Sequence, residues 1–279
     1  MRLTLGDGMR IFFKWTARIL LLLALAAVAI GMWKREQIIR LMAVNSLFSE
    51  DKIVNNFSSM NNAFLHRPVS RGNGPVSALP AGPTASLPPE VADWTKARDV
   101  TSLLAIKSGR IVHESYYLGT TPDDRRISWS MAKSFLSALF GVIVSEGKIA
   151  SLDDQVTTYA PLLKDSAYNG ATIRNVLQMT SGITFDEEYL DFYSDINRMG
   201  RVLALGGTMD GFAAGLTAHD TAPGARWKYV SIDTHVLAMV LRGATGRGIA
   251  DLLSEKIITP LGFEAEPYYL TDGMGVAFA

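Results

Sequence analysis

The residues ISWSMAKS at positions 127–134 combine a turn, the start of a helix and two reactive side chains. The hydroxyl of Ser130 stands three residues before the amine of Lys133, where the turn runs into the apolar stretch 135–144. If that stretch is helical, Ser130 lies at its N-terminus, and Lys133 returns beside the hydroxyl one turn later. A serine next to an amine is suited to act as an activated nucleophile.

The same Ser-x-x-Lys spacing occurs twice more, at Ser49 with Lys52 and at Ser145 with Lys148. The first pair sits among charged residues and the second falls where the predicted helix ends, so both are interpreted as solvated surface. Ser130 differs because apolar residues flank it on both sides, which would partly desolvate its lysine and favour a basic role. The alternative is a buried helix N-cap serine with a snorkelling lysine.

Composition limits the classes of function. The 279 residues are 48% hydrophobic, enough for one large core or two modest ones, and 27 basic residues balance 27 acidic ones, so nothing points to nucleic acid. There is no cysteine, which excludes disulfides and thiolate catalysis and suits an oxidising periplasm as well as the cytosol. The four histidines lack metal-ligand spacing, so neither a metal nor another cofactor is expected.

The segment 19–33 carries no charge and follows a basic N-terminal segment, residues 1–18. It is interpreted as a targeting or anchoring element outside the fold. It is short for a membrane span of about 20 residues, and residues 27–29 (AVA) offer a site like those of signal peptidase. Because the apolar run continues and Lys34 follows it directly, we favour an uncleaved anchor over a cleaved signal. The remainder would then be exported to the periplasmic face of a bacterial inner membrane, or to the periplasm if cleavage occurs.

Residues 34–90 lead from this segment to the folded unit. They are predicted to form a juxtamembrane helix that breaks up near residues 55–62, followed by an extended connector over 68–89 that is rich in Pro and Gly. The composition fits both a flexible linker and a connector lying on the domain surface. The folded unit is predicted over 91–279.

The pattern within the folded unit places strands before helices. Residues 102–117 predict a β-hairpin with its turn at 107–110. Helical signals follow at residues 131–146, 173–179, 233–242 and 249–257. This order indicates an α+β fold.

A second stretch whose residues could take part in catalysis is PGARWKYVS, residues 223–231. It is a turn that leads to Tyr229 just before a new helix. A phenol held near a lysine ammonium can shuttle a proton between a nucleophile and a leaving group. The alternative is a core aromatic residue whose hydroxyl is satisfied by packing neighbours.

Together these segments resemble the serine β-lactamase and penicillin-recognising family, in the branch that holds class C β-lactamases, family VIII esterases and 6-aminohexanoate-dimer hydrolases. The resemblance covers about residues 66–279 and rests on five stretches in the family's order. They are the hairpin at 102–117, ISWSMAKS at 127–134, GKIASLDD at 147–154, IRNVLQMTSGI at 173–183 and the turn before Tyr229. RPVSRG at 67–72 and FDEEY at 185–189 resemble the aminohexanoate-dimer hydrolases in particular.

The resemblance implies a β-lactamase/transpeptidase-like fold, with an antiparallel sheet flanked by helices and a helical subdomain. It implies that Ser130 is the acylated nucleophile, that Lys133 lowers its proton affinity, and that Tyr229 is the general acid/base. Backbone N–H groups would hold the oxyanion, one from Ser130 and another from a C-terminal strand. Tyr189 and Ser231 are predicted substrate contacts, although Tyr189 fits a plain surface aromatic equally well.

Two departures from the family pattern bear on function. Ser231 replaces the Asn of the lactamase Tyr-x-Asn motif, which disfavours a β-lactamase relative to an esterase or amidase. The family's third motif, a Lys-Thr-Gly or His-x-Gly triplet, does not occur before Ala279. We therefore expect the C-terminal strands to be missing from this sequence, the hairpin to have an unpaired edge and an uncovered face, and the chain alone to be aggregation-prone and inactive.

The expected function is that of a serine hydrolase that acts through an acyl-enzyme on a small-molecule amide or ester, like a 6-aminohexanoate-oligomer hydrolase or esterase. A Ser-His-Asp hydrolase is disfavoured because the sequence contains no Gly-x-Ser-x-Gly elbow. The alternative is a membrane-anchored penicillin-binding or peptidoglycan-sensing protein with little turnover, or a β-lactamase. The presence of Ser130, Lys133 and Tyr229 together favours turnover, because a pure binder needs no proton-shuttling phenol.

Overall fold

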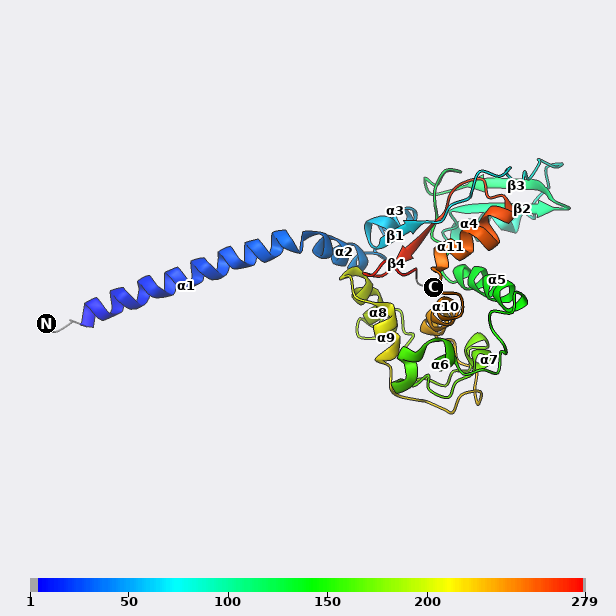
Figure 1. Ribbon diagram of the computed structural model, residues 1–279. Helices are drawn as coiled ribbons and strands as arrows, with labels where there is room; N and C mark the ends of the chain where they lie inside the picture. Colours follow the sequence, from blue (N-terminus) through cyan, green and yellow to red (C-terminus); the bar gives the residue numbers. More distant parts are fainter. Residues whose placement is uncertain (1–4, 278–279) are drawn as a thin grey trace.

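A long apolar helix, α1 (Leu5–Trp33), projects away from the folded part of the molecule (Figure 1). The computed structural model describes residues 5–277. Within α1, the segment Phe12–Trp33 has a mean hydropathy of 2.0 and is not buried against other residues. By length and composition this segment could cross a membrane, and a signal sequence would have the same character.

Helix α2 (Arg35–Asn45) continues α1 after a single residue, Lys34. Backbone bonds run through the junction, from Lys34 N to Ile30 O at 2.8 Å and from Ile38 N to Lys34 O at 3.0 Å. Two short helical pieces follow, α3 (Ile53–Ser58) and η1 (Met60–Asn62). The helical segment after α1 is thus first interrupted at residues 46–52, earlier than the break that the sequence predicts near residues 55–62.

The strands form two small antiparallel sheets. β2 (Ser102–Lys107) and β3 (Arg110–Tyr116) make the predicted hairpin, whose turn residues Ser108 and Gly109 both have positive φ. Leu104 and Ile106 on β2 are each 50% exposed, so one face of the hairpin is uncovered in the part of the chain that the structure describes. The second sheet pairs β1 (Leu65–Pro68) with β4 (Tyr268–Thr271), and the sequence did not predict it.

The Pro-rich connector lies on the domain surface. Backbone N–H groups at Val69, Ser77 and Gly82 donate to carbonyls of Pro267, Gly262 and Ile111, each at 2.8 Å. These bonds attach it to both ends of the folded unit, so its extended conformation is fixed by pairing. It ends at α4 (Glu90–Ala97).

Helix α10 (Ser231–Thr245) forms the centre of the core. Every residue from 231 to 241 is buried, which is expected of a helix packed on all sides. It packs against α5 (Met131–Ser145), α6 (Val156–Tyr159), α7 (Ile173–Leu177) and α9 (Met209–Ala214). The remaining helices are η2 (Pro161–Asp165), α8 (Asp195–Ala204), α11 (Ile249–Leu253), η3 (Ser254–Ile258) and α12 (Thr259–Leu261).

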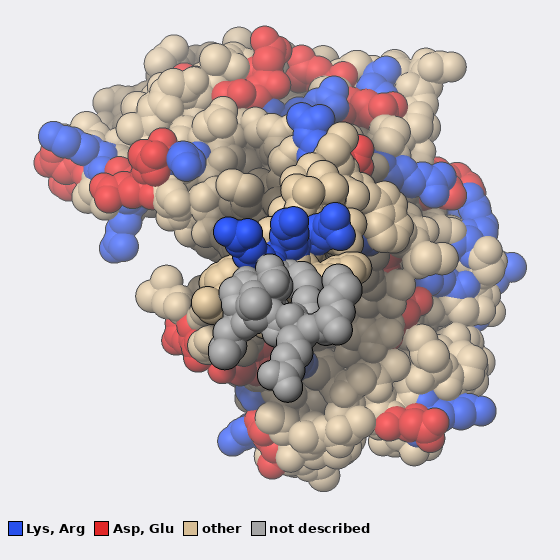
Figure 2. Space-filling model, turned by 90° about the vertical axis from the view of Figure 1, so that its left-hand side faces the viewer, with Lys and Arg blue, Asp and Glu red and all other residues tan. Residues whose placement is uncertain are grey.

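Helices that surround a buried helix, together with two small antiparallel sheets, confirm the predicted α+β class. Core side chains also come from Leu47, Met60 and Phe64, upstream of the boundary at residue 91 that the sequence predicts. On the face shown in Figure 2, Lys and Arg side chains are intermixed with Asp and Glu, in keeping with the balanced charge of the sequence.

Candidate functional site

Ser130 is the N-cap residue of α5, as the sequence predicts. Its side chain is exposed and makes no capping bond to the helix backbone, so the alternative of a buried capping serine is wrong. The residue before it, Trp129, has φ +45°, a left-handed conformation that is uncommon for a bulky side chain. The turn thus presents the Ser130 hydroxyl at the surface and begins the helix directly behind it.

Lys133 lies in the first turn of α5, where its backbone N–H donates to Ser130 O at 3.1 Å. Its side chain is half-buried, and its ammonium nitrogen stands 5.5 Å from the centre of the Tyr229 ring. A cation at this distance from an aromatic ring is attracted to the ring face. The Lys133 ammonium therefore lies beside the Tyr229 ring, one helical turn after Ser130.

Tyr229 is positioned by residues 179–183, the end of the stretch IRNVLQMTSGI at 173–183. Lys228 N donates to Met179 O at 2.9 Å, and Asp220 N donates to Gly182 O at 2.8 Å. Gly182 has φ +78°, and a Cβ on it would stand 2.3 Å from Thr221 O. Only glycine allows the two backbones to approach this closely, so this residue fixes where the Tyr229 turn lies.

The structure brings the three predicted catalytic residues together. The hydroxyl oxygens of Ser130 and Tyr229 are 2.7 Å apart, and either can be the donor. With Lys133 at the phenol ring, the arrangement brings together a hydroxyl that could act as a nucleophile, a phenol oxygen that could exchange a proton with it, and a cation. Tyr229 is half-buried with its hydroxyl on Ser130, so the alternative of a core aromatic satisfied by packing neighbours is wrong.

Tyr189 and Ser231, the two predicted substrate contacts, both bind one carboxylate, that of Glu187. The Tyr189 hydroxyl donates to Glu187 Oε1 at 2.8 Å, the Ser231 hydroxyl donates to the same oxygen, and Ser231 N donates to Oε2 at 3.1 Å. Burial, followed by the bond to Glu187, raises the pKa of Tyr189 to about 12, which keeps this phenol protonated. Ser231 is buried, whereas the Tyr189 ring is half-exposed.

Sequence reasoning missed Glu187. It lies in the stretch FDEEY, and its carboxylate sits at the N-terminus of α10, whose N-cap residue Val230 has no side-chain capping bond. A carboxylate is favoured at a helix N-terminus because it accepts from free N–H groups and complements the helix dipole. In the sequence, Glu187 is only an acidic residue two positions before Tyr189. Its hydrogen-bond partner, Ser231, is 44 residues away.

A buried carboxyl lies one half-turn beyond Ser231 on α10. Asp233 is 0% exposed, and its Oδ1 accepts a bond from the Tyr168 hydroxyl at 2.8 Å. Burial raises the pKa of Asp233 to about 7, against the bond from Tyr168, and the negative charge of Glu187 adds to the rise. Asp233 is thus coupled electrostatically to Glu187, which binds Tyr189 and Ser231.

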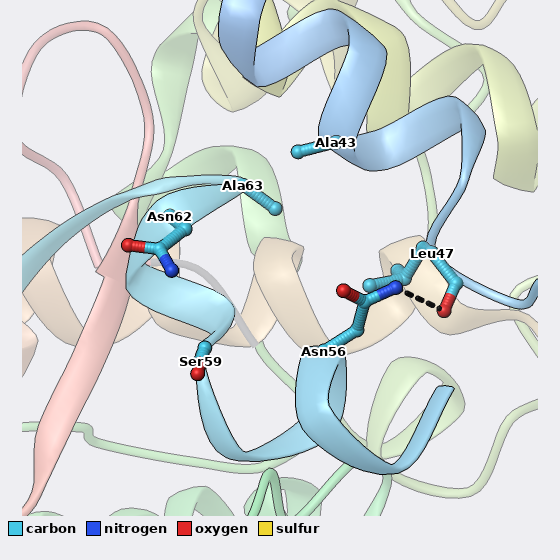
Figure 3. Close-up of a pocket in the computed structure, with 6 residues that line it drawn as sticks. All are labelled: Ala43, Leu47, Asn56, Ser59, Asn62 and Ala63. Atoms are coloured by element: carbon cyan, nitrogen blue, oxygen red, sulfur yellow. Dashed lines mark hydrogen bonds between the residues drawn. The ribbon is translucent and has the colours of Figure 1, made fainter. Parts of the chain in front are cut away.

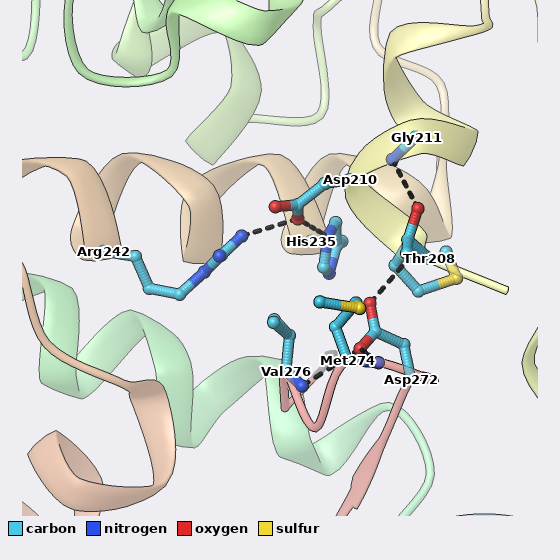
Figure 4. Close-up of polar contacts among 9 residues, drawn as sticks. Thr208, Asp210, Gly211, His235, Arg242, Asp272, Met274 and Val276 are labelled. Carbon is cyan, nitrogen blue, oxygen red and sulfur yellow. Dashed lines mark hydrogen bonds and ion pairs between the residues drawn. The ribbon is translucent and has the colours of Figure 1, made fainter. Parts of the chain in front are cut away.

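A separate polar cluster ties α9 and α10 to the last described turn (Figure 4). Asp210 accepts bonds from His235 and Arg242, and these bonds outweigh its burial and lower the pKa of Asp210 to about 2. Asp272 accepts from the backbone of Met209 at 3.0 Å. Within residues 5–277, no three His, Asp or Glu side chains are grouped so as to hold a metal ion.

Comparisons with known proteins agree with the motif order. A family model described as beta-lactamase matches residues 91–265. Over 219 residues, the chain is 27% identical to the 6-aminohexanoate-dimer hydrolase of Paenarthrobacter ureafaciens, an alignment that covers 76% of this chain and 56% of that protein. The chain therefore spans little more than half the length of this curated relative.

A solved structure from Bacillus anthracis, described as a candidate 6-aminohexanoate-dimer hydrolase, has a TM-score of 0.72 to this chain. The two are 19% identical, and the match covers 83% of this chain and 65% of the other. Similarity at this identity shows the fold alone. The β-lactamase/transpeptidase-like fold that the resemblance implies is thereby confirmed.

Proposed function

We propose that this chain, which belongs to the beta-lactamase family, carries the nucleophile and proton-handling groups of a serine hydrolase that acts through an acyl-enzyme. The observation that supports this most directly is the 2.7 Å contact between the hydroxyls of Ser130 and Tyr229, with Lys133 at the phenol ring. We assign the hydrolase domain to residues 91–279 and the anchor to residues 19–33.

In the proposed reaction, Ser130 Oγ attacks the carbonyl carbon of the substrate while its proton passes to the phenolate oxygen of Tyr229. Lys133 favours that phenolate electrostatically, and the Ser130 backbone N–H is one donor to the oxyanion. The phenol then protonates the departing amine or alcohol, which leaves an acyl group on Ser130. A water molecule then loses a proton to the Tyr229 oxygen and attacks the acyl carbon. As the ester bond breaks, the phenol returns this proton to Ser130 Oγ and the acid is released.

The proposed substrates are small-molecule amides or esters. The 27% identity to a 6-aminohexanoate-dimer hydrolase supports this class. So does the Tyr229–Ser231 motif, because Ser231 lacks the amide of the lactamase Tyr-x-Asn motif and its hydroxyl is bound to Glu187. Tyr189, half-exposed in the same loop, is the proposed contact with the substrate.

The test is to measure steady-state rates with the full-length protein and three substrates. These are a p-nitrophenyl ester, the linear 6-aminohexanoate dimer and a chromogenic cephalosporin. We expect the ester or the amide to be hydrolysed well above the cephalosporin. Ser130→Ala should lower kcat by at least about a thousandfold, and Tyr229→Phe by about 10²–10⁴-fold.

The matched controls are Ser128→Ala, an exposed serine two residues away, and Lys148→Ala in the second Ser-x-x-Lys match of the same helix region. Both should retain the parent rate. Hydrolysis that survives Ser130→Ala would contradict the proposal. Persistent labelling by a fluorescent penicillin without release would favour a penicillin-binding protein instead.

A further inference from the structure

The turn that presents Ser130 is held by aromatic rings from the juxtamembrane segment. The ring of Phe48 stacks on Trp129 with centroids 5.8 Å apart and planes 19° apart. The ring of Phe57 meets Trp129 edge-on at 5.2 Å and 71°. We call these three residues, Phe48, Phe57 and Trp129, the aromatic clamp.

Trp129 needs such support because of its backbone. Its φ of +45° is a conformation that a bulky residue keeps only where its surroundings enforce it. Ser130 follows directly, and Ala132 N donates to Trp129 O at 2.9 Å as α5 begins. Relaxation of Trp129 to an ordinary φ would therefore turn the Ser130 side chain away from its present direction.

The backbone is tied to the same segment. Ile127 N donates to Phe57 O at 2.9 Å, and the guanidinium of Arg126 donates to Val54 O. The residues just before Trp129 are thus bonded to α3, and the Trp129 side chain lies against the ring of Phe57. Both contacts would be lost together if α3 moved.

The juxtamembrane segment is itself fixed in place. Asn56 Nδ2 donates to Ser46 O at 3.0 Å and to Leu47 O at 3.1 Å, which joins α3 to the end of α2 (Figure 3). Between them is a cavity of only about 30 Å³, lined by Ala43 and five neighbours. Helix α2 in turn packs along α8, where Arg40 Nε donates to Ala204 O at 3.1 Å.

We propose that Phe48 and Phe57 are positioning residues for the nucleophile: they hold Trp129 in its left-handed conformation and so aim Ser130 Oγ at the Tyr229 hydroxyl. The inference rests on the proposed function, in which Ser130 is acylated. Both residues lie outside the stretch 91–265 that matches the family model. The juxtamembrane segment, which follows the apolar helix α1, would therefore help to position the nucleophile.

The test measures the acylation rate of the full-length protein with a rhodamine-tagged fluorophosphonate, as kinact and KI separately. Phe48→Ala and Phe57→Ala should each slow kinact, and the double variant should slow it by about tenfold or more, because a small misplacement of the reacting oxygen is costly. KI should change by less than about twofold, because Phe48 and Phe57 are proposed to act through Trp129 and not by binding the substrate. Phe48→Tyr and Phe57→Tyr, which keep the rings, should restore the rate.

The matched control is Trp94→Ala, which removes a 51% exposed aromatic residue from α4, against 53% exposure for Phe48. Its kinact should equal that of the parent. In a Trp129→Ala background, removal of Phe48 and Phe57 should slow acylation no further, because all three act through one backbone conformation. If the double variant unfolds at the assay temperature, Phe48→Leu, which keeps most of the apolar burial, should still slow kinact.

Three results would count against the inference. Parent-like kinact in both Phe48→Leu and Phe57→Ala would overturn it and leave the proposed function intact. Additive losses in the Trp129→Ala background would show that the phenylalanines do not act through Trp129. If the parent protein is not labelled at Ser130 at all, the proposed function fails and the inference fails with it.

Discussion

Ser130 and Tyr229 lie 99 residues apart in the sequence, and their hydroxyl oxygens lie 2.7 Å apart in the structure. Each side chain was predicted from its own motif, Ser130 from a turn that enters a helix and Tyr229 from a turn that precedes one. The distance between them depends on the close approach of Gly182 to Thr221, which no local pattern predicts. The resemblance to the β-lactamase family implied that the two residues act in one site, but no local pattern in the sequence gives the distance between them.

At the same scale, Asp233 should make the stability of the protein depend on pH. Its pKa of about 7 in the folded state exceeds its ordinary value of 3.8, so the folded state keeps a proton that the unfolded state has lost between these pH values. Stability should therefore fall as the pH rises from about 4 to about 7, by a few kcal/mol. Urea unfolding at pH 5 and pH 8 measures this change.

Asp233→Asn keeps an acceptor for the Tyr168 hydroxyl and removes the ionisable proton. The variant should lose less stability than the parent between pH 5 and pH 8. Asp210→Asn is the control. The pKa of Asp210 is lowered to about 2, so its stabilising charge is lost only as the pH falls below about 4. This variant should therefore show the parent's change in stability between pH 5 and pH 8. Equal pH dependence in the parent and in Asp233→Asn would refute this assignment.

At the scale of elements, the segment 179–183 should control the position of the Tyr229 turn. In Gly182→Ala, the new Cβ would meet Thr221 O at 2.3 Å and φ +78° would be strained. Gly119→Ala is the matched control, since φ is +77° and no atom lies within 4 Å. We expect the control to cost about 1–2 kcal/mol in free energy of unfolding and Gly182→Ala to cost a further 1–3 kcal/mol, about the cost of overpacking.

The two variants should also differ in activity. Because Gly182→Ala displaces the turn that carries Tyr229, its kcat should fall, whereas Gly119→Ala should keep the parent kcat at a temperature where both remain folded. Thermal unfolding and ester hydrolysis measure the two effects separately. Equal kcat in both variants would show that the turn does not depend on the approach of Gly182.

Strong local signals were sufficient for the larger elements. The hairpin β2–β3 was predicted from alternation and its turn, and α5 and α10 were predicted from apolar periodicity and their preceding turns. The pairing of β1 with β4 could not be predicted, because each strand has four residues and Leu65 pairs with Thr271 across most of the chain. Its stability comes from tertiary contacts rather than from the propensity of either strand.

The same limit explains the unpredicted parts of the site. Glu187 accepts a hydrogen bond from Ser231, which is 44 residues away, and the ring of Phe57 in the juxtamembrane segment packs against Trp129. Sequence patterns describe these residues only as an acidic position in a loop and as an apolar position in a broken helix. Their roles depend on which elements fold against each other.

At the scale of the whole molecule, α2 connects the apolar helix α1 directly to the domain that carries the candidate site (Figure 1). The proposed anchor, residues 19–33, lies within the segment Phe12–Trp33, which is long and apolar enough to cross a membrane. Leu22→Arg with Leu25→Arg should release the protein to the soluble fraction, since each arginine at mid-span costs about 2.5–3.5 kcal/mol on insertion scales. Fractionation of the producing cells after a carbonate wash measures the partition.

The control is Leu104→Arg with Ile106→Arg on the exposed face of the hairpin, which adds the same charge away from α1. This variant should remain in the membrane fraction. Retention of the Leu22→Arg, Leu25→Arg variant in the membrane would contradict anchoring by α1. A parent protein whose mass lacks the first residues would instead indicate a cleaved signal.

If Ser130 is the residue that becomes acylated, mass spectrometry of the protein trapped by a covalent inhibitor will find the adduct on this residue. The full-length protein is treated with a fluorophosphonate, and its intact mass and its peptides are then measured. We predict one adduct per chain, on the peptide that contains Ser130, and no adduct in Ser130→Ala, while Ser128→Ala is labelled like the parent. An adduct on another residue, or equal labelling of Ser130→Ala, would show that Ser130 is not the nucleophile.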